Sequence, residues 1–201
     1  MLARELERYR GEPGLLVLAL PRGGVPVGFE LAQALEAPLD VFVVRKLGAP
    51  GQEELALGAV ARGVQVLNDG VVEALGLDAA VIERAAATEQ RELTRRERLY
   101  RGDRRPVDVE GRTVILVDDG LATGATMRAG ALALRAKRPR RLVLAVPVAA
   151  AQTCELLRAD ADELVCASTP EPFVAVGAWY DDFSQTTDDE VRALLARSSG
   201  G

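Results

Sequence analysis

Two adjacent carboxylates, Asp118 and Asp119, directly follow an apolar run and directly precede a loop rich in glycine and threonine. The apolar run, residues 114–117, is largely β-branched and predicts a buried parallel strand. The loop, residues 120–126, leads into a helical pattern that begins near Gly124. Because ligands of open α/β sheets bind just beyond the carboxyl ends of the strands, this stretch predicts a ligand site.

The residue types in this stretch suit recognition of a sugar phosphate. Free N–H groups at the first turn of a helix bind anions, and glycine lets the backbone approach them closely. Thr123 and Thr126 can donate hydroxyl hydrogen bonds to the same phosphate. Asp118 and Asp119 would repel a phosphate, but they suit sugar hydroxyl groups or a divalent cation beside it.

The stretch VILVDDGLATGAT closely resembles the PRPP-binding motif of the type I phosphoribosyltransferase family, where PRPP is 5-phosphoribosyl 1-pyrophosphate. The alternative is a strand–helix turn in an unrelated α/β protein. The resemblance implies substitution at the ribose anomeric carbon, with Mg²⁺-bound pyrophosphate leaving. It also implies that Asp118 and Asp119 hold the ribose hydroxyls and stabilise developing positive charge. The 5-phosphate would then bind to Ala122, Thr123, Gly124, Ala125 and Thr126.

A second candidate segment, Pro21-Arg22-Gly23-Gly24, follows another apolar strand pattern at residues 15–20 and opens a helical pattern. Consecutive glycines let backbone amides face an anion, and arginine is a natural partner for a phosphate. The segment resembles the family's pyrophosphate loop, although a Gly-Gly turn before a helix is common elsewhere. The resemblance suggests a cis non-proline peptide or a positive φ in this turn.

The third candidate segment begins with Arg45 and Lys46, at the end of the expected second strand, residues 39–44. A glycine- and proline-rich loop is expected over residues 45–52. The same place in the family carries a basic residue for pyrophosphate and a mobile loop that closes over the reaction, so residues 48–54 are the expected lid. A solvated loop with two ordinary surface cations is the alternative.

The nitrogenous acceptor is not identified by the sequence. Hypoxanthine–guanine members carry a third acid where this chain has Ala122, and adenine-type members carry a glutamate in the lid, a role open to Glu53 or Glu54. Acceptor choice in the family usually depends on a variable hood. Two segments could form it: the insertion at residues 69–105, or a C-terminal hood at about residues 173–197. The second contains the candidate acceptor residues Trp179, Tyr180 and Asp181, which could equally be a buried tryptophan with a capping acid.

Strand and helix patterns alternate from residue 15 to residue 166, which predicts an α/β fold, a parallel sheet flanked by helices. A β-hairpin is expected at residues 55–67 around Arg62-Gly63, followed by a helical insertion whose longer part is capped by Asp78. We expect one phosphoribosyltransferase-like domain over residues 1–201.

The composition narrows the chemistry further. The chain has 201 residues, 48% of them hydrophobic, a net charge of −5 and no histidine. A histidine-based triad and histidine-ligated zinc are therefore excluded. Cys154 and Cys166 lack metal-ligand spacing and are expected to be buried free thiols. With neither a signal peptide nor a membrane-length apolar run recognised, a cytoplasmic location is expected.

The acidic balance argues against general nucleic-acid binding. The basic run at residues 91–105 keeps RNA or another partner open, although an amphipathic helix with pairs such as Glu92 and Arg96 is favoured. We therefore expect a Mg²⁺-dependent phosphoribosyltransferase, a glycosyltransferase of nucleotide metabolism or salvage that uses PRPP and a small nitrogenous acceptor. A non-catalytic PRPP or nucleotide sensor is the alternative, and homo-oligomerisation is left open.

Overall fold

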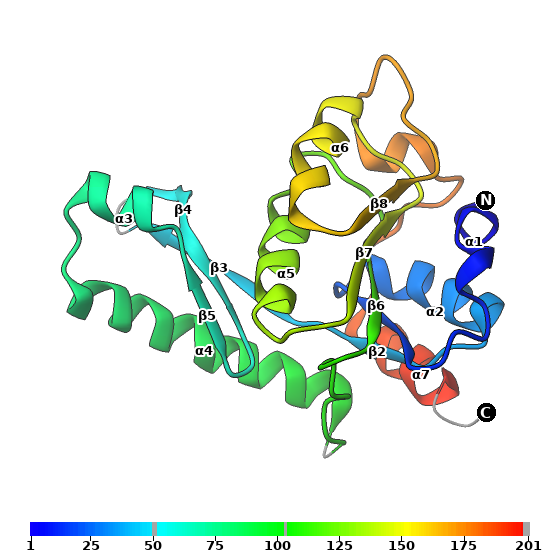
Figure 1. Ribbon diagram of the computed structural model, residues 1–201, viewed down its shortest axis with the longest axis horizontal. Helices are drawn as coiled ribbons and strands as arrows, with labels where there is room; N and C mark the ends of the chain where they lie inside the picture. Colours follow the sequence, from blue (N-terminus) through cyan, green and yellow to red (C-terminus); the bar gives the residue numbers. More distant parts are fainter. Residues whose placement is uncertain (50–51, 103, 199–201) are drawn as a thin grey trace.

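A five-stranded parallel sheet forms the centre of the computed structural model, which describes residues 1–49, 52–102 and 104–198 (Figure 1). The strand order is β2-β1-β6-β7-β8, so β6 lies in the middle. The predicted α/β class is confirmed. The strands are β1 (Leu15–Ala19), β2 (Leu39–Val41), β6 (Thr113–Val117), β7 (Arg141–Val146) and β8 (Glu163–Cys166).

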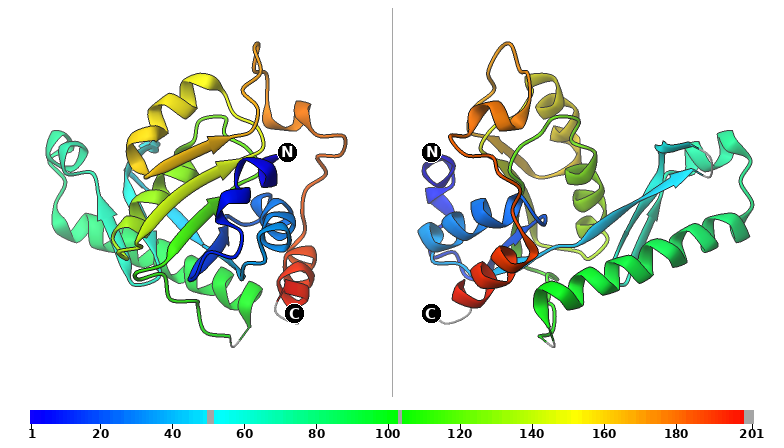
Figure 2. Two further views of the ribbon diagram at one scale, coloured as in Figure 1. Left: turned by 45° about the vertical axis from the view of Figure 1, so that its right-hand side comes forward. Right: turned by 180° about the vertical axis from the view of Figure 1, so that it is seen from behind.

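Helices cover both faces of this sheet, because successive side chains of a strand point to opposite sides. One set of strand residues packs with α1, α2 and α7, and the alternate set packs with α5 and α6 (Figure 2). Each set forms its own buried apolar cluster. The helices are α1 (Leu2–Glu5), α2 (Gly24–Leu35), α5 (Ala125–Arg135), α6 (Ala151–Leu157) and α7 (Asp188–Ser198), with short 3-10 turns η1 (Glu7–Tyr9), η2 (Arg158–Asp160) and η3 (Val176–Trp179).

An arm projects from this core between β2 and β6, and the views of Figures 1 and 2 agree on its direction. It consists of a three-stranded antiparallel sheet and two helices. The predicted hairpin around Arg62-Gly63 is confirmed, as is the Asp78 cap, whose carboxylate accepts from the Ala80 amide at 3.0 Å. The arm elements are β3 (Val44–Ala49), β4 (Gln52–Ala61), β5 (Val64–Leu67), α3 (Asp69–Leu75) and α4 (Ala79–Arg101).

The expectation of a loop over residues 45–52 is wrong for the described part of that range. Residues 45–49 belong to β3 and residue 52 begins β4, and the two strands pair with each other. Gly48 favoured a loop in the sequence, but the structure places it at a register irregularity, a position that suits glycine within a strand. The central lid positions, residues 50–51, lie outside the described residues.

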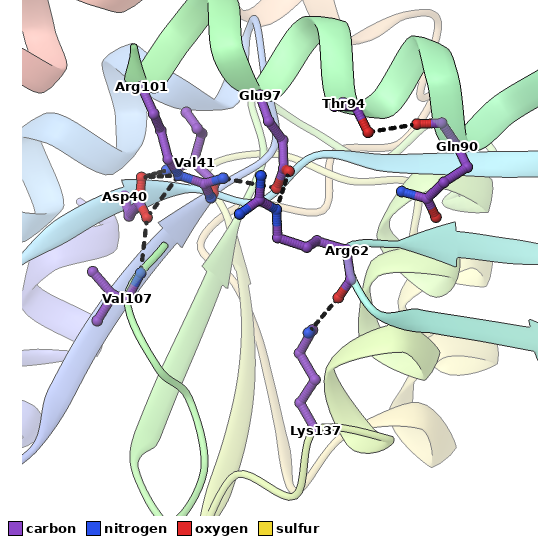
Figure 3. A network of polar contacts seen from close by, with 9 residues as sticks. All are labelled: Asp40, Val41, Arg62, Gln90, Thr94, Glu97, Arg101, Val107 and Lys137. Carbon is purple, nitrogen blue, oxygen red and sulfur yellow. Dashed lines mark hydrogen bonds and ion pairs between the residues drawn. The ribbon is translucent and has the colours of Figure 1, made fainter. Parts of the chain in front are cut away.

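Buried charges fasten the arm to the core (Figure 3). The Arg101 guanidinium of α4 donates to the Asp40 carboxylate of β2 at 2.9 Å and to Glu97 at 2.7 Å. Glu97 also accepts from Arg62, in the β4–β5 turn, at 2.7 Å, and Lys137 donates to the Arg62 carbonyl at 2.6 Å. The network therefore joins both chain segments of the arm to the sheet and to the end of α5.

The expectation of free thiols is also wrong. Cys154 of α6 and Cys166 of β8 form a disulfide, and no free cysteine remains among the described residues. The bond arises because α6 packs against β8, a tertiary contact that the 12-residue spacing does not reveal. In the described ranges, none of the helices combines the length and apolarity needed to cross a membrane.

Candidate functional site

Asp118 and Asp119 lie at the carboxyl end of the central strand β6, half-buried side by side. The Asp119 amide donates to the Asp118 carboxylate at 2.9 Å. Burial, followed by the negative charge of Asp119, raises the pKa of Asp118 to about 8. Burial also raises the pKa of Asp119. The acid pair therefore holds a proton more strongly than an isolated aspartate does, and a cation bound beside the pair would favour its release.

The glycines of the second candidate segment pack directly on this acid pair. β1 and β6 are parallel neighbours, so the loops that follow them meet at one edge of the sheet. A Cβ added to Gly23 would lie 2.0 Å from an Asp119 carboxylate oxygen, and one added to Gly24 would lie 2.8 Å from the Val117 carbonyl. Only glycine permits this approach. The Pro21–Arg22 peptide is cis, which confirms the non-proline cis bond suggested for this turn.

The predicted phosphate loop, residues 122–126, is largely open to solvent at the N-terminus of α5. Gly124 caps the helix with a φ of +71°, a conformation that favours glycine. Ala122, Thr123 and Thr126 are exposed, and the Thr153 hydroxyl of α6 donates to the Ala122 carbonyl at 2.6 Å. The loop thus combines a helix N-terminus flanked by exposed residues with the supporting contact from Thr153, an arrangement suited to an anion.

The C-terminal hood candidate lies against the acid pair. The Tyr180 hydroxyl donates to the Asp119 carbonyl at 2.5 Å, and a Cβ on Gly120 would lie 2.6 Å from the Val176 side chain. Burial, and then the charges of both aspartates, raise the pKa of Tyr180. Trp179 is 49% exposed, so the alternative of a buried tryptophan is wrong. Asp181 is exposed beside it.

The three candidate basic residues, Arg22, Arg45 and Lys46, lie in different surroundings. Arg22 lies in the turn on the acid pair, and one guanidinium nitrogen is 3.9 Å from the Asp188 carboxylate of α7. Arg45 of β3 instead pairs with Glu89 of α4 at 2.7 Å, and Lys46 is exposed. Within the described chain, the structure thus brings Arg22 to the acid-pair edge, but neither Arg45 nor Lys46. The side chains of residues 53 and 54 lie outside the description.

Three contributions to this site were missed from the sequence. Thr153 supports the phosphate loop, Val176 covers Gly120, and Asp188 faces Arg22. Thr153 and Val176 stand in ordinary helical and apolar runs that carried no signal. Asp188 falls within the expected C-terminal hood, residues 173–197, and carried no signal of its own. The i,i+4 pairing of Glu92 with Arg96, at 2.8 Å, is confirmed.

Comparison with known proteins gives consistent matches across the chain. The sequence profile described as the phosphoribosyl transferase domain matches residues 1–182. Two Mycobacterium tuberculosis proteins, provisionally named phosphoribosyl transferases MT0597 and Rv0571c, are each 48% identical over 198 residues. These matches cover 98% of this chain but 44% of each relative, so the chain spans less than half of their length.

A solved structure is similar over nearly the whole chain. The crystal structure of TT1426 from Thermus thermophilus is 45% identical, with a TM-score of 0.90. The match covers 99% of this chain and 94% of that one. The similarity therefore includes the arm and the C-terminal segment as well as the central sheet.

Proposed function

The chain belongs to the phosphoribosyl transferase family, and from this membership we propose that it transfers ribose 5-phosphate from PRPP to a nitrogenous acceptor and releases pyrophosphate. The reaction would make it a pentosyltransferase, within the glycosyltransferases. The observation that carries the proposal is the direct packing of the Gly23-Gly24 turn on Asp118 and Asp119. A turn suited to an anion and two carboxylates suited to hydroxyl groups thereby meet at one sheet edge, as binding of a sugar phosphate requires.

Each part of this edge has a proposed role. The exposed loop at residues 122–126 binds the 5-phosphate through backbone amides and the hydroxyls of Thr123 and Thr126. Asp118 and Asp119 accept hydrogen bonds from the ribose hydroxyls. The bond from the anomeric carbon to pyrophosphate breaks as the acceptor nitrogen bonds to that carbon. The carboxylates favour the positive charge that gathers on the sugar in the transition state.

Arg22 and the Gly23 amide bind the pyrophosphate, which gathers negative charge as it leaves. The Gly24 amide donates to the Leu20 carbonyl at 3.1 Å, so Gly24 contributes through its close approach to the acid pair. We assign Arg45 and Lys46 to the same leaving group, a role that requires β3 to move toward the acid pair. Arg45 would have to exchange Glu89 for the ligand, because it is paired with that glutamate in the ligand-free protein.

The donor set at the acid pair fits Mg²⁺. Two adjacent carboxylates meet there, and no cationic side chain of the described residues contributes to the pKa of either. Mg²⁺ commonly uses one or two carboxylates and completes its shell with substrate oxygens and water. When bound, the ion would neutralise charge on PRPP and on Asp118 and Asp119.

The acceptor is proposed to bind beneath the C-terminal hood. Tyr180 and Phe183 form an aromatic pair with ring centroids 5.2 Å apart, and Trp179 stands exposed next to Tyr180. Aromatic faces suit a planar heterocyclic base, and the exposed Asp181 carboxylate suits an exocyclic amine. These features support a small nitrogenous base as the acceptor, and we propose nucleotide metabolism in the cytoplasm as the setting of the reaction.

Pyrophosphate release from PRPP and Mg²⁺, screened across purines, pyrimidines and simple amines, tests this function. We expect release that depends on one acceptor class and disappears in the Asp118→Asn, Asp119→Asn double variant. Tight binding of PRPP with no release for any acceptor would instead support a sensor.

A further inference from the structure

The C-terminal helix α7 lies beyond residues 1–182, the part of the chain that the family profile matches, yet it packs beside the site. Val191 and Leu195 are buried against the core, and the Arg197 guanidinium lies 4.7 Å from the centre of the Phe29 ring of α2. α2 is the helix that begins in the Gly23-Gly24 turn. α7 therefore packs against the helix that begins at the proposed pyrophosphate turn.

The first turn of α7 is fixed by a reciprocal cap. The Glu190 amide donates to the Thr187 hydroxyl at 3.2 Å, and the Thr187 amide donates to the Glu190 carboxylate at 2.6 Å. This capping box satisfies two amides that would otherwise lack partners in the helix. Asp188, which lies between the two capping residues, is thereby set in place.

The Asp188 carboxylate joins three separate segments of the chain. One oxygen accepts from the hydroxyl of Tyr100, a buried residue of α4, at 3.0 Å. The same oxygen lies 3.9 Å from a terminal guanidinium nitrogen of Arg22. A carboxylate anchored by a buried phenol thus stands beside the arginine of the turn that packs on the acid pair.

We propose that Asp188 is a positioning residue for Arg22, a role that rests on the proposed function. The 3.9 Å separation exceeds hydrogen-bond distance, and among the described residues the Arg22 guanidinium makes no hydrogen bond, so its donors remain available to pyrophosphate. A long, flexible side chain loses conformational entropy when it binds a ligand. Because Asp188 already restrains Arg22, that loss is smaller when pyrophosphate or PRPP binds.

Asp188→Asn tests the role with little change of shape, since the amide oxygen can still accept from Tyr100. We expect the KM for PRPP to rise about two- to fivefold, the scale of a half-exposed ion pair, with kcat within about twofold. Asp189→Asn is the matched control, because Asp189 is the next residue and its side chain is 82% exposed. It removes the same charge and should leave KM unchanged. Tyr100→Phe, which removes the hydroxyl that anchors Asp188, should also raise the KM for PRPP. Asp188→Glu keeps the charge, so its KM should lie between that of the unaltered protein and that of Asp188→Asn.

A double-mutant cycle distinguishes positioning from a general structural effect. In an Arg22→Gln background, Asp188→Asn should have no further effect on the KM for PRPP, and urea denaturation should show that each variant folds. Equal effects of Asp188→Asn in both backgrounds would overturn the inference, as would a fall in KM, which would make Asp188 a competitor for Arg22. An unaltered protein that neither binds nor consumes PRPP would overturn the proposed function as well. Normal turnover with an unchanged KM in Asp188→Asn would overturn the positioning role alone.

Discussion

Asp118→Asn should stabilise the ligand-free protein, and the gain should grow with pH. Burial and the charge of Asp119 raise the pKa of Asp118 from 3.8 to about 8 in the folded protein. The folded state therefore keeps a proton that the unfolded chain has already lost. Between these two values the free energy of unfolding of the native protein falls as pH rises, and above about pH 8 the loss is complete. Asparagine has no proton to lose and avoids this penalty.

The size of the effect follows from the pKa. At about 1.4 kcal/mol per pH unit, the interval from pH 5 to pH 8 sets an upper limit of about 4 kcal/mol. Because the acid pair lies at a loop edge that can admit water, we expect about 2 kcal/mol. The side-chain oxygen of asparagine can still accept the hydrogen bond from the Asp119 amide, so the substitution does not lose that bond.

Urea denaturation of native and Asp118→Asn protein at pH 5 and pH 8.5 measures the difference directly. The variant should gain more at pH 8.5 than at pH 5, with unchanged m-values. Asp108→Asn removes an exposed carboxylate as a control, and its effect should stay within about 0.5 kcal/mol at both pH values. An equal gain for Asp118→Asn at both pH values, or a larger gain at pH 5, would refute the reasoning.

Three further substitutions test separate parts of the structure. Arg101→Met should reduce the free energy of unfolding by about 3–5 kcal/mol in urea denaturation, because it leaves the buried Asp40 carboxylate without its counter-charge and Glu97 with Arg62 alone. Arg138→Met, at an exposed ion pair, should cost less than about 1 kcal/mol. Gly23→Ala should weaken PRPP binding, measured by calorimetry, at least tenfold, because the added methyl group would collide with the acid pair. Gly70→Ala is the control, since Gly70 has space for a methyl group, and this variant should bind PRPP normally. Trp179→Ala should raise the KM of the acceptor by the equivalent of about 1–3 kcal/mol and leave that of PRPP unchanged, whereas equal weakening of both would contradict the division of the site.

The parts of the fold that the sequence predicted correctly depend on local patterns. The run of β-branched residues before Asp118 can form a buried strand, and Gly124 can begin the following helix with a positive φ. The contact between the Gly23-Gly24 turn and the acid pair then follows from parallel order, since both strands end at the same edge. The Arg62-Gly63 turn likewise located the β4–β5 hairpin, and the Asp78 cap located the start of the long helix α4.

The features that were missed depend on contacts between distant residues. Gly48 carried a loop signal, but pairing with β4 turned its segment into a strand. Arg45 looked available to a ligand until α4 brought Glu89 to it. The Cys154–Cys166 bond and the approach of Asp188 to Arg22 arise from packing of α6 and α7, which a helical pattern predicts as elements without fixing their neighbours.

The most direct test of the central claim is the joint measurement of both products from PRPP, Mg²⁺ and the acceptor that gives activity. Mass spectrometry should find the acceptor carrying ribose 5-phosphate in an amount equal to that of pyrophosphate. Both products should be absent with the folded Asp118→Asn, Asp119→Asn double variant. Pyrophosphate formed without a ribosylated product, or undiminished product from the double variant, would contradict transfer at this acid pair.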